Sequence, residues 1–243
     1  MEYTINIKGR LMDLSTPQVM GILNVTPDSF YSGSRKQTEM EIAQRANQII
    51  EEGGSIIDVG AFSTRPGADE VSEEEEGRRL KFALDIVRRE QPDAAVSVDT
   101  YRPTLARKCI EEWGADIIND VSEGGITGIV NVPLEQRQEE YPEMFRVVGE
   151  LKVPYILMSV QPTLETMMKG FAKEVQQLRD LGAKDIILDP GFCFGKNLIQ
   201  NYQIYNEMEK LNVMELPVLV GISRKTMIYK LLGGDATTSL NGT

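Results

Sequence analysis

The sequence predicts an α/β fold, a (β/α)8 TIM barrel preceded by a β-hairpin, from three observations. Short apolar runs alternate with longer segments of helical period, which is typical of parallel βαβ units. The 243 residues are close to the roughly 250 of such a barrel, and the 41% that are hydrophobic suffice for a large core. Polar residues directly follow the apolar runs, and barrels carry their chemistry at these strand ends.

The elements can be assigned in order along the chain. Residues 3–14 alternate in polarity around Lys8-Gly9-Arg10 and predict the hairpin. The apolar runs that predict strands are 19–23, 55–59, 95–98, 116–118, 154–158, 185–188 and 217–220. The segments that predict helices are 38–52, 72–90, 103–113, about 141–151, 164–181 and 198–211.

Capping residues support several of these helices. Thr38 has the character of an N-cap, and Ser72 with Glu75 matches a capping box. Pro103 stands at a first-turn position, where its missing N–H costs nothing. Gly114 follows the helix that Pro103 begins, as a C-terminal glycine should.

The organisation predicts one domain over residues 1–243, because no linker or low-complexity tract divides the chain. Residues 121–150 are rich in Gly and Pro and predict a long loop before the helix near 141–151. Seven strand–helix units can be assigned, so we expect a barrel truncated before its eighth strand, a fragment of a longer chain. An open doubly wound sheet is the alternative that needs no missing unit, but the hairpin and the strand-end chemistry favour the barrel.

Composition excludes several classes of function. A net charge of −11 argues against nonspecific binding to nucleic acid or to an anionic membrane. No apolar stretch approaches the roughly 20 residues that span a bilayer, and the N-terminus lacks the pattern of a secretory signal. The two cysteines, Cys109 and Cys193, have no metal-type spacing. We therefore expect a cytoplasmic protein that binds small molecules and neither nucleic acid nor membrane.

The chain contains no histidine, which limits its chemistry. A Ser-His-Asp triad and a zinc hydrolase site both need histidine. Any catalysis must rest on carboxylates, lysine, arginine, hydroxyl groups, backbone dipoles or a hard cation such as Mg²⁺.

Polar residues at the predicted strand ends form one candidate site. Taken singly, each has an ordinary structural explanation: an Asp as a helix N-cap, a Gly as a turn, an Asn as a turn former. Several polar strand ends on one rim are harder to explain in this way, because buried polar groups cost free energy unless they are paired. The residues concerned are Asn24, Thr64, Arg65, Pro66, Asp99, Asn119, Asp189, Phe194, Gly221, Lys225 and Thr226.

Their chemistry suits a flat, anionic ligand. Asp99, Asn119 and Asp189 offer acceptors and an amide donor to a heterocycle rich in N–H groups. Lys225 can reach a carbonyl oxygen of such a ring, and Arg65 can meet an anionic group. As a neutral Mg²⁺ ligand, Asn24 would need phosphate oxygens and waters to complete the octahedron.

Six motifs in order resemble the dihydropteroate synthase family of pterin-binding barrels. The resemblance runs from about residue 19 to residue 243, and no single motif is as specific as the set. The motifs are GILNVTPDSF (21–30), DVGAFSTRPGA (58–68), SVDTYRP (97–103), IINDVS (117–122), LDPGFCFGK (188–196) and GISRK (221–225).

The resemblance implies a transferase of folate biosynthesis that joins 4-aminobenzoate to 6-hydroxymethyl-7,8-dihydropterin diphosphate. It implies that Asp99, Asn119, Asp189 and Lys225 hold the pterin and that Gly221 lines the ring pocket. The other implied roles are Mg²⁺ binding for Asn24, closure over diphosphate and aminobenzoate for Thr64, Arg65 and Pro66, and the aminobenzoate border for Phe194, Lys225 and Thr226. It also implies a family of sulfonamide targets and a homodimer for the full-length protein.

The sequence also departs from the family pattern. The Arg-x-His-Asp segment with which the family usually ends is not found, so this chain is expected to be an inactive fragment if that segment is essential. Tyr31-Ser32-Gly33 stands where the family commonly has a second Asp, and Ser159 lies where a His is frequent. A pterin-binding methyltransferase domain and a noncatalytic pterin-binding protein are the alternatives, but the Ser-Thr-Arg-Pro and Ser-Arg-Lys segments favour the synthase.

Overall fold

The protein combines a small antiparallel hairpin with a parallel sheet whose strands follow one another in chain order. The computed structural model describes residues 3–25, 35–62, 71–125 and 141–242. The hairpin pairs β1 (Thr4–Ile7) with β2 (Arg10–Asp13). The strands of the parallel sheet are β3 (Met20–Asn24), β4 (Ile56–Gly60), β5 (Ala95–Asp99), β6 (Ile117–Asp120), β7 (Tyr155–Met158) and β8 (Ile186–Asp189).

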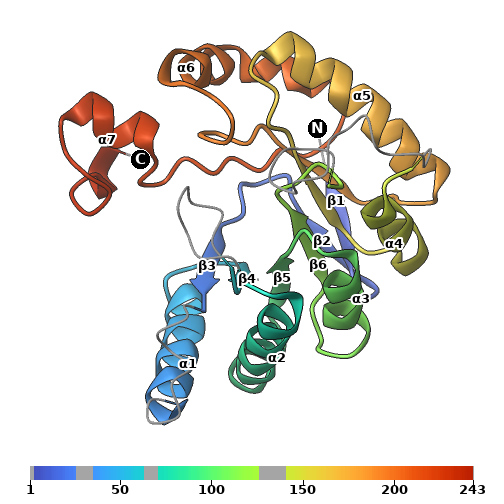
Figure 1. Ribbon diagram of the computed structural model, residues 1–243, viewed down its shortest axis with the longest axis vertical. Helices are drawn as coiled ribbons and strands as arrows, with labels where there is room; N and C mark the ends of the chain where they lie inside the picture. The colour runs from blue at the N-terminus through green and yellow to red at the C-terminus, as the bar shows by residue number, and fades with distance from the viewer. Residues whose placement is uncertain (1–2, 26–34, 63–70, 126–140, 243) are drawn as a thin grey trace.

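The helices lie on the outer side of this sheet and form an arc around it (Figure 1). The order β3-β4-β5-β6-β7-β8 never reverses, as in a barrel wall, whereas a doubly wound sheet has a reversal. The α/β fold with its hairpin is therefore confirmed. The helices are α1 (Arg35–Glu51), α2 (Glu73–Glu90), α3 (Pro103–Glu111), α4 (Glu143–Leu151), α5 (Leu164–Asp180), α6 (Leu198–Glu207) and α7 (Thr226–Leu232), with 3-10 segments η3 (Met208–Met214) and η4 (Leu240–Gly242).

Two of the predicted elements need correction. The run 217–220 does not form a strand of the sheet: its contact with β8 is a single bridge between Leu188 and Val218. Pro217 has no N–H to donate, and among the described residues no strand pairs with the other side of this run. Thr38 is not an N-cap, because α1 begins earlier, at Arg35, and Thr38 is buried inside the helix.

Other helix ends agree with the sequence. The Ser72 hydroxyl accepts a hydrogen bond from the Glu75 N–H, as an N-cap does, but the Glu75 carboxylate pairs with Arg79 at 2.6 Å, so only this half of the predicted capping box is formed. Pro103 is the first residue of α3. The helix predicted to reach residue 211 ends as an α-helix at Glu207 and continues as the tighter η3. None of the helices in the described ranges is long and apolar enough to cross a membrane.

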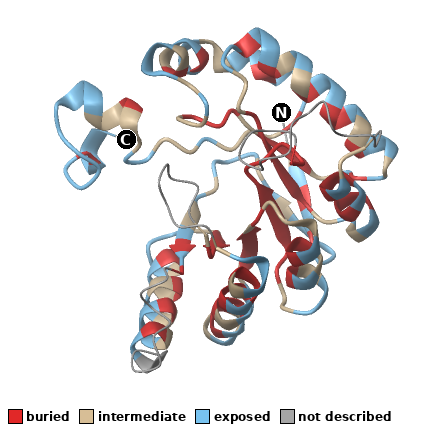
Figure 2. Cartoon of the chain, viewed as in Figure 1, coloured by how far each residue is buried: buried red, intermediate tan, exposed pale blue. Residues whose placement is uncertain are grey.

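The interior is built in layers by the alternation of side chains along each strand. Odd and even positions face opposite sides, so one set packs under the helices and the other points inward. The inner set at the amino-terminal ends is apolar and packs against Ile5 and Ile7 of the hairpin, which close this end. Its members are Ile56, Ala95, Ile117, Ile156 and Ile187. Figure 2 shows this buried interior in red along the strands.

Replacing Ile5 with Ala should destabilise the protein, because Ile5 is only 1% exposed and seals this apolar layer. We expect Ile5→Ala to lower the free energy of unfolding by about 2–4 kcal/mol in a urea titration. Leu11→Ala is the matched control on the same hairpin, since Leu11 is 71% exposed. Equal effects of the two variants would contradict the sealing role of Ile5.

Candidate active site

Polar residues from neighbouring strands stand side by side at the carboxyl end of the sheet. The register pairs Asn24 with Gly60, Gly60 with Asp99, and Asp99 with Asn119. Because these positions share the phase of the inward-facing apolar layer, their side chains all point to the interior. The sheet thus brings together Asn24, Asp99 and Asn119, as the sequence predicted.

Gly60 keeps this row compact. A Cβ atom on Gly60 would lie 2.8 Å from the Asn24 side-chain oxygen and 3.5 Å from Asp99 Oδ2. A larger residue here would displace the Asn24 amide, so the glycine allows Asn24 and Asp99 to approach each other. The amide of Asn24 is itself exposed at the rim and open to a ligand.

Buried acceptors in the row lack partners. Asn119 Nδ2 donates to Asp58 Oδ2 over 3.1 Å, but Asn119 Oδ1 and Asp99 Oδ1 have no hydrogen-bond partner among the described residues. Unpaired buried oxygens cost about 1–3 kcal/mol each. A ligand with several N–H donors would satisfy them, so the site favours such a ligand.

The carboxyl groups of the site lie in an environment that disfavours their charged form. Burial raises the pKa of Asp58, Asp99 and Asp189 above their ordinary range. The rise is largest for Asp99, where the neighbouring carboxyls of Asp58 and Glu76 add to the effect of burial. N–H donors from a ligand would stabilise the charged form of these groups.

A lysine lies close to one of these carboxyls, Asp189. Lys225 Nζ donates to the Phe192 carbonyl over 2.8 Å and lies 4.7 Å from the centre of the Phe194 ring. Burial lowers the pKa of Lys225, while the charge of Asp189 acts in the opposite direction. A Cβ atom on Gly221 would lie 3.6 Å from Lys225 Nζ, and Thr226 begins α7 directly after the lysine.

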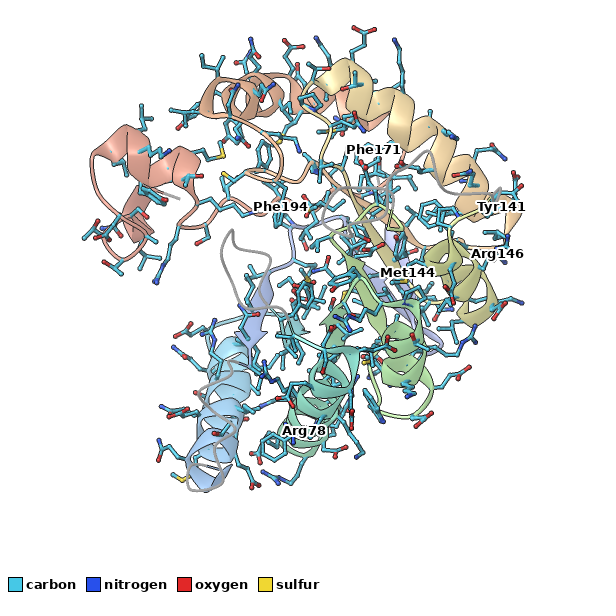
Figure 3. The ribbon with its side chains drawn as sticks, viewed as in Figure 1. Arg78, Tyr141, Met144, Arg146, Phe171 and Phe194 are labelled. Carbon is cyan, nitrogen blue, oxygen red and sulfur yellow. The ribbon has the colours of Figure 1, made fainter. Side chains whose placement is uncertain are left out.

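These contacts bring together Asp189, Phe194, Gly221, Lys225 and Thr226, as predicted. Figure 3 shows Phe194 on the inner side of the arc of helices, whereas Arg78 lies on α2, away from the centre. An aromatic ring and an ammonium group side by side suit a flat ring that carries a polar or anionic substituent. Thr64, Arg65, Pro66 and the loop that follows Val25, with Tyr31-Ser32-Gly33, lie outside the described residues.

Lys196 is a structural residue of the site that sequence reasoning missed. Its Nζ donates to the carbonyls of Ser159, Gly191 and Phe194 at 2.8, 3.0 and 3.1 Å. Burial lowers its pKa to about 8. These bonds tie the loop after β7 to the loop after β8, which carries Asp189 and Phe194. The sequence signal that could have pointed to Lys196 is its position at the end of a glycine-rich loop. Its partners are backbone atoms, which no sequence pattern reveals.

Asp120 directly follows Asn119 in the IINDVS motif, but it does not belong to the site. As the next residue along β6, it faces the helices instead. Its carboxylate accepts from the Tyr155 hydroxyl at 2.7 Å and from the N–H groups of Ser122 and Gly124, both at 2.8 Å. Asp120 therefore shapes the turn after β6 and does not line the site.

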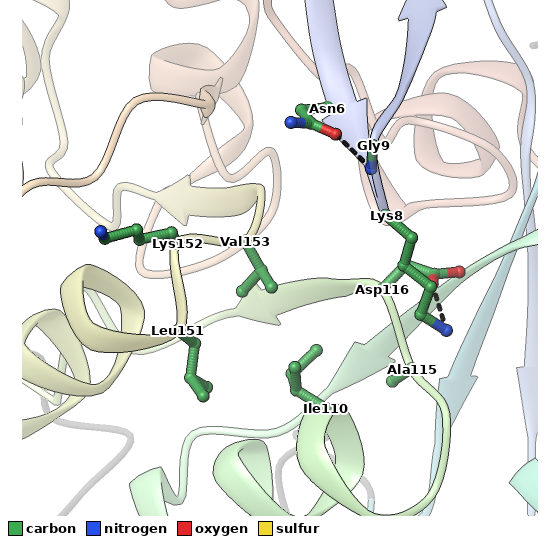
Figure 4. A pocket seen from close by; sticks show the side chains of 9 residues that line it. All are labelled: Asn6, Lys8, Gly9, Ile110, Ala115, Asp116, Leu151, Lys152 and Val153. Carbon is green, nitrogen blue, oxygen red and sulfur yellow. Dashed lines mark hydrogen bonds and ion pairs between the residues drawn. The ribbon is translucent and has the colours of Figure 1, made fainter.

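The described residues offer no cluster of three or more His, Cys, Asp or Glu side chains that could hold a metal ion. A cavity of about 250 Å³ lies at the opposite end of the strands, between the hairpin, α3 and α4 (Figure 4). Its lining includes Lys8 and Asp116, which form an ion pair of 2.7 Å. This cavity is separate from the polar row, so the candidate site is the carboxyl end of the sheet.

Comparison with known proteins identifies the family of this chain. A family described as "Pterin binding enzyme" matches residues 20–241. Fold, site and family match together define a pterin-binding barrel enzyme. The dihydropteroate synthase of Escherichia coli (strain K12) is 36% identical over 250 residues, which cover 97% of this chain and 83% of that protein. That of Streptococcus pyogenes serotype M18 is 35% identical, with 93% and 82% covered. The chain belongs to the dihydropteroate synthase family.

Solved structures of this family have the same fold. The Xanthomonas albilineans dihydropteroate synthase with 4-aminobenzoic acid matches with a TM-score of 0.85 and 30% identity, over 100% of this chain and 86% of that one. The Yersinia pestis enzyme in a sulfonamide drug complex matches with a TM-score of 0.81 and 33% identity, over 99% and 86%. Both are barrel enzymes, as the sheet order indicated.

A pH-dependent stability difference should follow from Glu174 on α5. Burial, with a smaller effect of the Glu123 carboxyl, raises its pKa from 4.5 to about 8. Between these values the folded state binds more protons than the unfolded state, so the stability contributed by this group falls as pH rises. We expect Glu174→Gln to raise the melting temperature clearly at pH 8 and less at pH 5.

The control for this comparison is Glu165→Gln on the same helix, where the exposed Glu165 pairs with Lys169. This substitution removes an exposed carboxylate and leaves the buried one in place. It should therefore not raise the melting temperature at pH 8. A gain from Glu174→Gln of the same size at both pH values would contradict the account.

Proposed function

We propose that this chain condenses 6-hydroxymethyl-7,8-dihydropterin diphosphate with 4-aminobenzoate and releases 7,8-dihydropteroate and diphosphate, a step of folate biosynthesis. The observation that carries the proposal is the row of inward-facing polar side chains with unpaired buried acceptors. The proposal is also supported by the dihydropteroate synthase of Escherichia coli (strain K12), which is 36% identical to this chain over nearly its whole length. A reduced pterin presents the N–H-rich edge that this row lacks.

The pterin would lie among Asp99, Asn119, Asp189 and Lys225, with Gly221 beside the ring. The unpaired oxygens of Asn119 and Asp99 accept from ring N–H groups. The Lys225 ammonium, close to Gly221, donates to the ring carbonyl. Each of these groups comes from a different strand or loop, so the ring is fixed in position and in orientation before any bond changes.

The aminobenzoate would occupy the border formed by Phe194, Lys225 and Thr226, with Pro66 on the loop proposed to close over it. The Phe194 ring offers an aromatic face, and the nearby ammonium of Lys225 attracts the carboxylate. The Xanthomonas albilineans structure was solved with 4-aminobenzoic acid, which supports this class of ligand. The sulfonamide complex of the Yersinia pestis enzyme supports the proposal that sulfonamides inhibit this chain, because they contain the same flat arylamine as 4-aminobenzoate.

The residues at the rim fit Mg²⁺ bound mainly by the substrate. The Asn24 amide oxygen is exposed there, and one neutral protein oxygen suits an ion whose other ligands are diphosphate oxygens and water. When bound, Mg²⁺ would neutralise the charge of the leaving diphosphate. Thr64 and Arg65 are the proposed protein partners of that diphosphate, and with Asn24 and Lys225 they form the proposed catalytic set.

The reaction needs no general base in this scheme. The bond between the pterin methylene carbon and the diphosphate oxygen breaks, and the positive charge spreads into the ring held by the buried carboxylates. The arylamine nitrogen then forms the new C–N bond and loses its proton to solvent. A site with several carboxylates stabilises this cationic ring more than the neutral substrate, which accelerates the step. The lack of histidine is consistent with this chemistry.

We also propose that residues 1–243 act as one pterin-binding domain in the cytoplasm. The free thiols of Cys109 and Cys193 suit a reducing compartment. For a homodimer, the support is the family resemblance alone.

The proposal is tested by turnover of the pterin diphosphate with 4-aminobenzoate and Mg²⁺. We expect dihydropteroate and diphosphate in equal amounts, and competition by a sulfonamide against 4-aminobenzoate. Asp189→Ala and Lys225→Ala should each weaken pterin binding by about 10- to 100-fold without unfolding the protein, because each removes a charged hydrogen-bonding group. Asp85→Ala, at an exposed ion pair on α2, should bind as the wild type does.

Other outcomes separate the alternatives. Pterin binding without diphosphate release would indicate a noncatalytic binding protein. Transfer of a methyl group from a methylated pterin to a corrinoid would indicate the methyltransferase. Wild-type affinity in Asp189→Ala or Lys225→Ala would contradict the assignment of the site.

A further inference from the structure

Asp58 is a buried carboxyl that the proposed reaction has not used. It stands inside β4, two residues before the end of the strand, and is 5% exposed. Its inward-facing position places it one layer below the row of Asn24, Gly60 and Asp99. A position inside an apolar strand does not resemble a strand-end ligand, which is why its role is visible only in the structure.

Asp58 faces two hydrogen-bonding side chains, the Ser97 hydroxyl and the side-chain amide of Asn119. Asn119 Nδ2 donates to Asp58 Oδ2 over 3.1 Å, and Asn119 is 7% exposed. The other end of the same amide, Oδ1, is buried and has no hydrogen-bond partner in the described part of the chain. The amide therefore has one end fixed by the protein and one end free for a ligand.

The chemistry of a carboxylate makes this arrangement directional. An ionised carboxylate only accepts hydrogen bonds, so Asn119 must turn its NH₂ group toward Asp58 and its carbonyl oxygen toward the interior. If Asp58 were replaced by a group that both donates and accepts, the amide could rotate and present its NH₂ group to the ligand. The ligand would then meet a donor where an acceptor is needed.

We propose that Asp58 is a positioning residue that orients the Asn119 amide and so selects ligands with an N–H donor at that place. The inference deepens the proposed function and rests on it, since the ligand is taken to be the pterin. Asp58 acts through Asn119 and does not itself contact the ring. The other charged groups near it, Asp99 and Asp189, come from β5 and β8.

A residue swap tests this role. Asp58→Asn lets the Asn119 amide rotate, and Asn119→Asp sets two carboxylates against each other, so each variant should weaken binding of 6-hydroxymethylpterin by about tenfold or more in calorimetry. The double variant D58N/N119D restores one donor and one acceptor between the two residues and still turns an acceptor oxygen to the ligand. It should bind within about threefold of the wild type, which is a non-additive result.

The controls separate the possible failures. Asp116→Asn removes a buried aspartate at the opposite end of the strands, so it should lower the melting temperature and leave pterin affinity unchanged. If the wild type does not bind the pterin, the proposed function fails. If the wild type binds and a folded double variant is no better than the single variants, the positioning role of Asp58 is overturned. If a single variant does not fold, the pterin affinity of the folded double variant decides: binding within about threefold of the wild type supports the positioning role, and weaker binding contradicts it.

Discussion

The two-residue alternation of side chains in a sequentially ordered parallel sheet is the constraint on which the rest of the structure depends. It sends one set of residues under the helices and the other into the interior. At the amino-terminal ends the inner set is apolar and is sealed by Ile5 and Ile7 of the hairpin. At the carboxyl ends it is polar, and the register places Asn24, Gly60 and Asp99 in one row. The same periodicity turns Asp120 away from the site.

This separation into an apolar end and a polar end explains how the fold stays stable while polar groups of the site lack hydrogen-bond partners. The apolar layer and the helices hold the strands, so the polar end need not contribute to folding. Buried carboxyls with raised pKa values, and amide and carboxyl oxygens without partners, are costly in the free protein. A ligand rich in N–H groups removes that cost on binding, and a ring that becomes cationic during the reaction removes more of it. Lys196 and Asp58 keep the geometry by holding a loop and an amide in place.

Much of the fold and of the site could be predicted from the sequence, for physical reasons that also set the limits. Asp99, Asn119 and Asp189 could be predicted because each ends an apolar run, and the ends of parallel strands meet at one edge. Asp58 could not, because it lies within such a run. The partners of Lys196 are backbone carbonyls, one of them 37 residues away, and no residue pattern encodes them. The run 217–220 has the composition of a strand, but pairing depends on neighbours that composition does not specify.

The central claim is that the inner row receives the pterin, and side-chain amide signals in nuclear magnetic resonance test it most directly. With asparagine labelled with ¹⁵N, 6-hydroxymethylpterin should shift the NH₂ signals of Asn119, because its amide contacts the ring. The Asn24 signals should shift further only when the diphosphate and Mg²⁺ are present, and those of the capping residue Asn197 should stay unchanged. Binding of the pterin with no change at Asn119 would contradict the account.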